Sequence, residues 1–140
     1  MNDTINPSAK KILIVEDDYF ISDIYKRVFT KAGYIVESAL DGEIAINTVK
    51  DKTFDIILLD IMLPKVTGIN VLKEFRKPES KVLHTPVFLI TNLGQEAIIK
   101  EAFKIGADGY LLKAQLAPQD IVAEINNFFI KKSQPENVSQ

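Results

Sequence analysis

The chain has 140 residues, a length that suits one globular domain, with 46% hydrophobic and 26% charged residues. Its 17 lysine and arginine residues against 19 aspartate and glutamate residues give a net charge of -2, which excludes the basic excess typical of nucleic-acid binding. The absence of cysteine excludes disulfides, thiolate metal sites and thiol nucleophiles.

The first predicted elements are a strand and a helix. The run KILIV at 11–15 is rich in β-branched and other apolar residues and predicts a buried strand. Three acids follow it directly, and the last of them, Asp18, is placed to cap the next helix. The apolar face that we expect for this helix carries Phe20, Ile24, Val28 and Ala32.

The alternation of strand and helix continues to about residue 131. Further strands are expected at 34–39, 54–59, 86–90 and 109–112. Further helices are expected where apolar residues recur at helical spacing: Ala45 and Val49; Ile69, Leu72 and Phe75; Ile98, Ala102 and Ile105; Ile121, Ile125, Phe128 and Phe129. Gly33 and Gly106 stand where helix ends need a left-handed residue, Pro78 follows the third helix, and Pro118 can open the fifth.

Apolar strands that alternate with helices predict a parallel sheet covered on both faces. The expected fold class is α/β: a doubly wound, flavodoxin-like (βα)5 sandwich with a five-stranded parallel sheet in the order 2-1-3-4-5. We expect one domain at 10–132, between flexible segments at 1–9 and 133–140. No signal-peptide core and no run of 18 apolar residues occurs, so we expect a cytoplasmic protein.

Reactive side chains follow four of the five predicted strands. Glu16 and Asp17 follow the first, Asp60 the third, Thr91 ends the fourth and Lys113 ends the fifth. Ligands of open parallel α/β sheets bind outside the carboxyl ends of the strands. In the expected strand order, the first and third strands are neighbours, so their terminal acids must meet.

Such a cluster of acids needs neutralisation. Two carboxylates about 5 Å apart repel by about 3 kcal/mol at an effective dielectric of about 20. Glu16, Asp17 and Asp60 carry a charge of -3, and Lys113 supplies only one positive charge. A hard divalent cation with oxygen ligands, such as Mg²⁺, would balance the site, whereas a raised pKa is the alternative.

Four segments at these strand ends resemble the receiver domain of two-component response regulators. They are VEDD at 15–18, LLDIMLPKVTG at 58–68, LIT at 89–91 and GADGYLLK at 106–113. The resemblance implies that Asp60 accepts a phosphoryl group. It also implies that Mg²⁺ is bound by Asp17, Asp60 and the main-chain carbonyl of Met62, with Glu16 acting mainly through water.

The resemblance further implies that Thr91 and Lys113 hold phosphoryl oxygens and that Tyr110 rotates inward when the site is occupied. The phosphodonor would be a sensor histidine kinase or a histidine phosphotransfer protein. The chain would not be an enzyme beyond its own phosphorylation and dephosphorylation. Because the chain ends soon after the fifth helix, we expect a stand-alone domain, monomeric or weakly dimeric, without direct nucleic-acid or membrane contact. Output would pass to a protein partner through the face around 92–110.

Other interpretations remain open for several of these residues. Thr91 could be an ordinary strand residue, Lys113 a surface lysine, and Tyr110 static core. His84, the only histidine, is expected to be a solvated loop residue. Receiver domains usually have proline after the lysine, whereas this chain has Ala114, so we expect a trans peptide there.

Two alternative functions are a receiver-like interaction module that is never phosphorylated and a Mg²⁺-dependent phosphohydrolase. Ala114 mildly favours the first, and the intact acids and lysine oppose it. The second resembles enzymes with DxDxT around the nucleophile, whereas Met62 stands at the second acid's place here. Because Met62 and Leu93 are apolar and would position water poorly, we expect slow hydrolysis of an aspartyl phosphate.

Overall fold

The computed structural model describes residues 10–92 and 96–134. The flexible segment expected at 1–9, Leu93, and residues 135–140 of the flexible segment expected at 133–140 lie outside these residues. The first residue of that second segment, Ser133, is instead the last residue of the fifth helix. Within them, no helix is both long and apolar enough to cross a membrane.

A parallel sheet of five strands forms the centre of the molecule, in the order β2-β1-β3-β4-β5, which confirms the predicted topology. The strands are β1 (Lys11–Val15), β2 (Ile35–Ala39), β3 (Ile56–Asp60), β4 (Val87–Thr91) and β5 (Gly109–Leu112). The helices are α1 (Tyr19–Lys31), α2 (Gly42–Asp51), α3 (Gly68–Phe75), α4 (Glu96–Ile105) and α5 (Pro118–Ser133). A 3-10 turn, η2 (Lys113–Gln115), precedes α5.

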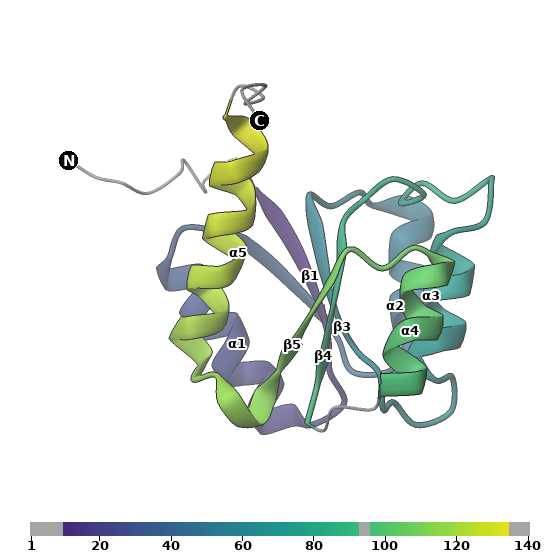
Figure 1. The fold of residues 1–140 in the computed structure, drawn as a ribbon, viewed down its shortest axis with the longest axis horizontal. Coiled ribbons are helices and arrows are strands. Elements are labelled where there is room, and N and C mark those ends of the chain that lie inside the picture. Colours follow the sequence, from purple (N-terminus) through teal and green to yellow (C-terminus); the bar gives the residue numbers. More distant parts are fainter. Residues whose placement is uncertain (1–9, 93–95, 135–140) are drawn as a thin grey trace.

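The helices cover both faces of the sheet, with α1 and α5 on one face and α2, α3 and α4 on the other (Figure 1). Successive residues of a strand point to opposite faces, and β1 follows this rule. Ile12 and Ile14 pack with α1 and α5, whereas Leu13 and Val15 pack with the other three helices. Because both faces are covered, the central strand β3 is buried at every residue.

Local signals in the sequence fix several helix ends. Asp18 caps α1 as predicted, because its Oδ1 accepts hydrogen bonds from the main-chain N–H groups of Phe20 and Ile21 at 2.9 and 3.1 Å. Gly33 and Gly106 have φ angles of 102° and 132°, in the left-handed region where glycine is favoured. Both glycine predictions are confirmed.

The predicted buried face of α1 was wrong for its first two residues, whereas Val28 and Ala32 are partly buried against the core. Phe20 and Ile24 are 77% and 43% exposed, whereas Ser22, Tyr25 and Phe29 are buried. Two rows of apolar residues run along this helix at helical spacing, one with Phe20 and Ile24 and one with Tyr25 and Phe29. The row with Tyr25 and Phe29 packs on the sheet. Packing these two aromatic side chains removes more apolar surface from water.

Candidate functional site

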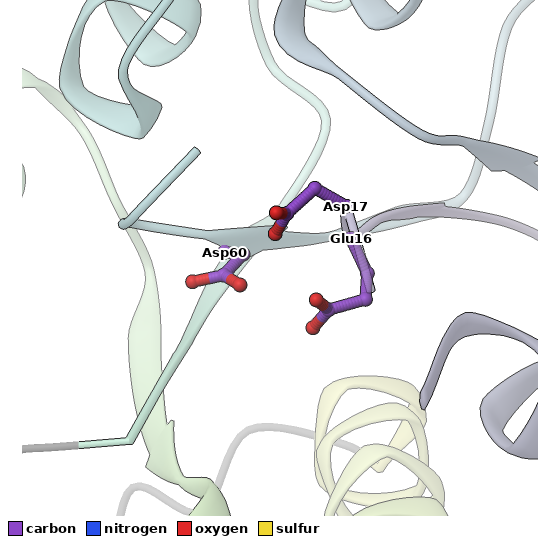
Figure 2. Close-up of side chains that lie close together, drawn as sticks. All are labelled: Glu16, Asp17 and Asp60. Carbon is purple, nitrogen blue, oxygen red and sulfur yellow. The ribbon is translucent and has the colours of Figure 1, made fainter. Parts of the chain in front are cut away.

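The carboxyl ends of β1 and β3 lie side by side and bring three acids together. Glu16 and Asp17 follow β1 directly, and Asp60 is the last residue of β3. Each offers one carboxylate oxygen within 4.8 Å of the others. Figure 2 shows the three side chains converging from the two strands. The predicted meeting of these acids is therefore confirmed.

Lys113 bridges two of these acids. Its Nζ donates a hydrogen bond to Asp60 Oδ2 at 3.0 Å and another to Glu16 Oε1. The side chains of Lys113, Glu16 and Asp60 are only 9%, 3% and 7% exposed. Lys113 is thus not an ordinary surface lysine, because its charge lies inside the protein between two carboxylates.

The second oxygen of each bridged carboxylate is held by the main chain. Glu16 Oε2 accepts from the N–H of Asp18 at 2.9 Å, and Asp60 Oδ1 accepts from the N–H of Met62 at 3.0 Å. Both carboxylates are therefore fixed at two points. Asp17, in contrast, is exposed at the mouth of the site.

Burial and charge shift two pKa values in this group. Burial raises the pKa of Glu16, and the charge of Asp60 adds to this, although the hydrogen bond from Lys113 opposes it. For Lys113, burial alone would lower the pKa, but the hydrogen bond to Glu16 and the charge of Asp60 outweigh it, so the pKa is raised. Lys113 is therefore held in its charged form.

The donor set fits a hard divalent cation. Three carboxylates and one ammonium leave a formal charge of -2. Carboxylate oxygens close together at a pocket mouth are the ligands that Mg²⁺ prefers. Since Asp17 is exposed, it can take up a cation that keeps several of its waters.

A glycine brings α3 against the backbone of Asp60. A Cβ atom at Gly68 would lie 2.4 Å from the carbonyl oxygen of Asp60 and 2.7 Å from Ile61 Cα. The N–H of Gly68 donates to the carbonyl of Ile61 at 2.9 Å. The β3–α3 loop therefore closes tightly against the main chain of Asp60 and Ile61.

The acids and Lys113 line a pocket of about 320 Å³. Its wall includes Thr91, which is fully buried at the end of β4. Sequence reasoning missed Ile21 of α1 and Asn92 as lining residues, although the position of Asn92 directly after Thr91 was a usable signal. The full lining is Glu16, Asp17, Asp18, Ile21, Asp60, Met62, Thr91, Asn92 and Lys113.

Comparisons with known proteins agree with this geometry. The family model described as "Response regulator receiver domain" matches residues 12–126. This chain belongs to the response regulator receiver family. Receiver domains are signalling domains that interact with histidine kinases and downstream targets. The predicted family is thus confirmed.

Several curated relatives contain such a receiver domain. The chain is 33% identical over 121 residues to the chemotaxis protein CheY of Thermotoga maritima, covering 84% of this chain and 96% of that protein. It is 35% identical over 118 residues to "Probable transcriptional regulator ycf27" of Guillardia theta, covering 84% of this chain and 44% of that protein. For ycf27 and the regulators CrdR and ResD, the chain spans about half of the relative, between 44% and 55%.

Solved receiver structures share the fold. A CheY-like receiver domain protein from Methanospirillum hungatei has a TM-score of 0.79 at 27% identity, covering 88% of this chain and 95% of that one. Vibrio cholerae CheY4 has a TM-score of 0.78 at 28% identity, covering 84% and 97%. The predicted fold class is confirmed.

Tyr110 of this receiver domain points outward. Its side chain is 45% exposed, and its ring lies edge-on against Phe103 of α4, with centroids 6.3 Å apart and an interplanar angle of 80°. The interpretation of Tyr110 as static core was therefore wrong. Two exposed rings from α4 and β5 instead form a small aromatic surface.

The loop after β5 of this receiver domain departs from the usual family pattern. Lys113 opens the 3-10 turn η2, one residue beyond the end of β5. Among the described residues no peptide bond is cis, so the trans peptide expected before Ala114 is confirmed. His84 is exposed in the turn before β4, as predicted.

Tyr25 is a further residue of α1 that the sequence analysis did not single out. It is 5% exposed on the sheet-facing side of α1. Burial raises the pKa of its phenol, and the charges of Lys113, Glu16 and Asp60 also act on it. Tyr25 packs in the apolar core between α1, α5 and the sheet.

Proposed function

We propose that this receiver domain accepts a phosphoryl group on Asp60 from the phosphohistidine of a sensor histidine kinase or histidine phosphotransfer protein. The observation that carries the proposal is the buried bridge of Lys113 to Glu16 and Asp60 beside the exposed Asp17. In the transfer, a carboxylate oxygen of Asp60 forms a bond to phosphorus as the bond from phosphorus to the histidine nitrogen breaks. The electron pair of that bond remains on the imidazole.

The chain's own residues supply orientation and charge for this step. The N–H of Met62 and the ammonium of Lys113 hold the Asp60 carboxylate in one direction. Phosphoryl transfer needs an aligned nucleophile and cations near the equatorial oxygens. Asp17, Asp60 and the carbonyl of Met62 would hold Mg²⁺, with Glu16 acting mainly through water. When bound, Mg²⁺ supplies positive charge to the phosphoryl oxygens.

Thr91 and Tyr110 are proposed to report the occupancy of the site. Thr91 lies fully buried in the pocket wall, where its hydroxyl can donate to a phosphoryl oxygen. A shift of Thr91 would free space into which the exposed ring of Tyr110 can turn. The aromatic surface of Phe103 and Tyr110 would then change shape, and a downstream protein would bind one form better.

The lifetime of the phosphorylated form is proposed to be long. Met62 lines the pocket and is 58% exposed, so an apolar thioether stands where water would approach the phosphoryl group. A methionine side chain has only a weak acceptor with which to orient an attacking water. Replacement of Met62 by glutamate or asparagine should therefore speed loss of the phosphoryl group, and an unchanged lifetime would contradict this part.

The test of the proposed function is a phosphorylation assay followed by mass. The protein is incubated with Mg²⁺ and acetyl phosphate, and one phosphoryl adduct is expected. Asp60→Asn should abolish the adduct, and so should EDTA. Asp55→Asn is the matched control, since the Asp55 carboxylate accepts from the N–H of Lys11 just before β3, at the opposite end of that strand from Asp60. No adduct on the wild-type chain would favour the interaction module, and turnover of added phosphoesters would favour the hydrolase.

A further inference from the structure

Arg76, at the end of α3, holds a junction far from the phosphoacceptor pocket. Its side chain is 12% exposed. Its guanidinium donates to main-chain carbonyls at distances of 2.8 to 3.2 Å and to Oδ2 of Asp108 at 3.2 Å. The carbonyls belong to Val82, Leu83, Thr85 and Gly106. We call Arg76 with these five partners the Arg76 clamp.

The clamp fixes the turn between α4 and β5. Gly106 has a φ of 132°, and a Cβ atom there would lie 2.9 Å from Arg76 Nε, so only glycine allows the guanidinium to approach. Asp108 also makes two hydrogen bonds with the main chain of Val87. Its Oδ2 accepts from the N–H of Val87, and its own N–H donates to the carbonyl of Val87, both at 2.8 Å.

The turn lies at the edge of the sheet where strands begin, opposite the phosphoacceptor pocket. Asp108 pairs with Val87, the first residue of β4, whereas the pocket forms after the last residue of that strand. Helix α4 starts at the edge of the sheet where β4 ends and runs back toward the edge where β5 begins, next to α3 (Figure 1). One end of α4 is thus near the site, and the other end is held by Arg76.

Helix α4 is otherwise lightly anchored. Its buried residues are Ile99 and Ala102, out of ten, with Ile98 and Ile105 partly buried against the core. Helix α3 buries four of eight residues, including Val71, Leu72 and Phe75. The start of α3 is fixed as well, because Gly68 packs on the carbonyl of Asp60. Helix α3 with Arg76 is therefore the more deeply packed member of this pair.

We propose that the Arg76 clamp is the fixed pivot of the face formed by α4 and β5. The rearrangement that follows phosphorylation of Asp60 is confined to the start of α4 and to Tyr110, while residues 106–108 keep their position. This inference rests on the proposed function. Several hydrogen bonds from one planar group hold the turn, so a small displacement would break them together.

The test compares Arg76→Lys with Arg27→Lys by amide hydrogen exchange. Lysine keeps the charge but cannot reach this set of acceptors with a planar fork. Arg27 is the chain's other arginine and pairs with Asp23 on the surface of α1, so it serves as the matched control. Exchange is followed at Ala107 and Asp108, whose N–H groups donate to the carbonyls of Ala102 and Val87.

In the wild-type chain, exchange at Ala107 and Asp108 should change by less than about twofold on phosphorylation with acetyl phosphate and Mg²⁺, while residues 96–100 and Tyr110 change by more than about tenfold. Arg76→Lys should speed exchange at both amides by about tenfold or more before phosphorylation, and should extend the phosphorylation-dependent change into 104–108. Arg27→Lys should match the wild type.

Each other outcome has a definite meaning. The proposal that the clamp is a fixed pivot would be wrong if phosphorylation of the wild-type chain changed exchange at Ala107 and Asp108 as much as at Tyr110. It would also be wrong if exchange at these two amides were the same in Arg76→Lys as in the wild type. If the wild-type chain forms no adduct, the proposed function fails and the pivot with it. Exchange in the unphosphorylated variants would still show separately whether Arg76 holds the turn.

Discussion

Lys113 and Arg76 are both buried cations, at opposite edges of the same sheet, and they differ in what surrounds them. Lys113 faces two carboxylates with a third nearby, whereas Arg76 faces neutral carbonyls and one carboxylate. An ammonium is a compact charge on a flexible stem, but a guanidinium is a planar fork that matches a fixed set of acceptors. The edge with Lys113 carries excess negative charge that a cation can neutralise. At the edge with Arg76, the hydrogen-bonding groups around the guanidinium already have their partners.

The largest effect should follow from Arg76→Met, which removes the guanidinium donor from the carbonyls of the clamp; among them, the carbonyl of Val82 keeps the N–H of Thr85. Buried acceptors that lose a partner cost about 1 to 3 kcal/mol each when water cannot reach them, so the free energy of unfolding should fall by about 3 kcal/mol. Urea unfolding measures it, and 10 mM Mg²⁺ should not restore the loss. A fall below about 1 kcal/mol would mean that water replaces the guanidinium.

Lys113→Met should cost less, about 2 kcal/mol, because the bridged carboxylates open onto a pocket that water and cations can enter. Here Mg²⁺ should restore at least half of the loss, since it supplies the missing positive charge. Urea unfolding with and without Mg²⁺ makes the comparison. If Mg²⁺ raised the free energy of unfolding of Arg76→Met and Lys113→Met equally, the two edges of the sheet would not differ in their need for a cation.

The same acid-to-amide change should have opposite signs at the two edges. Asp60→Asn removes one of three crowded charges and should stabilise the metal-free chain by about 1 kcal/mol. Asp108→Asn weakens a charge-assisted hydrogen bond to Arg76 and should destabilise it by about 1 kcal/mol. Thermal unfolding in EDTA measures both, and equal signs would contradict the comparison.

The smallest effect concerns pH. Burial raises the pKa of Glu16, so the folded chain binds more protons than the unfolded chain above the ordinary glutamate value of about 4.3. The free energy of unfolding of the wild type should therefore fall, relative to Glu16→Gln, as pH rises from that value through the raised pKa. Saturating Mg²⁺ should flatten this difference, and a difference that grows with pH would contradict the assignment.

Much of the site could be predicted because strand ends are visible in the sequence. Glu16, Asp17, Asp60 and Lys113 each follow an apolar run, and the parallel topology then brings them to one edge. The Arg76 clamp could not be predicted in this way. Its acceptors are mostly main-chain carbonyls, which every residue has, so they leave no mark in the sequence.

Two other details depended on packing. Phe20 and Ile24 follow a helical period but lie on the wrong side of α1, because periodicity alone does not choose between two apolar stripes. The outward-facing ring of Tyr110 contacts Phe103 of α4, a neighbouring element. Both features are set by tertiary contacts, which override local preference.

The contact of Gly68 with the carbonyl of Asp60 has a consequence for protein engineering. A designer who transplants the acids and the lysine onto another parallel sheet would reproduce the residue types. The main-chain position that packing against Gly68 gives Asp60 would be lost. The segment from Asp60 to Gly68 would have to be moved as one piece, together with the first turn of the helix behind it.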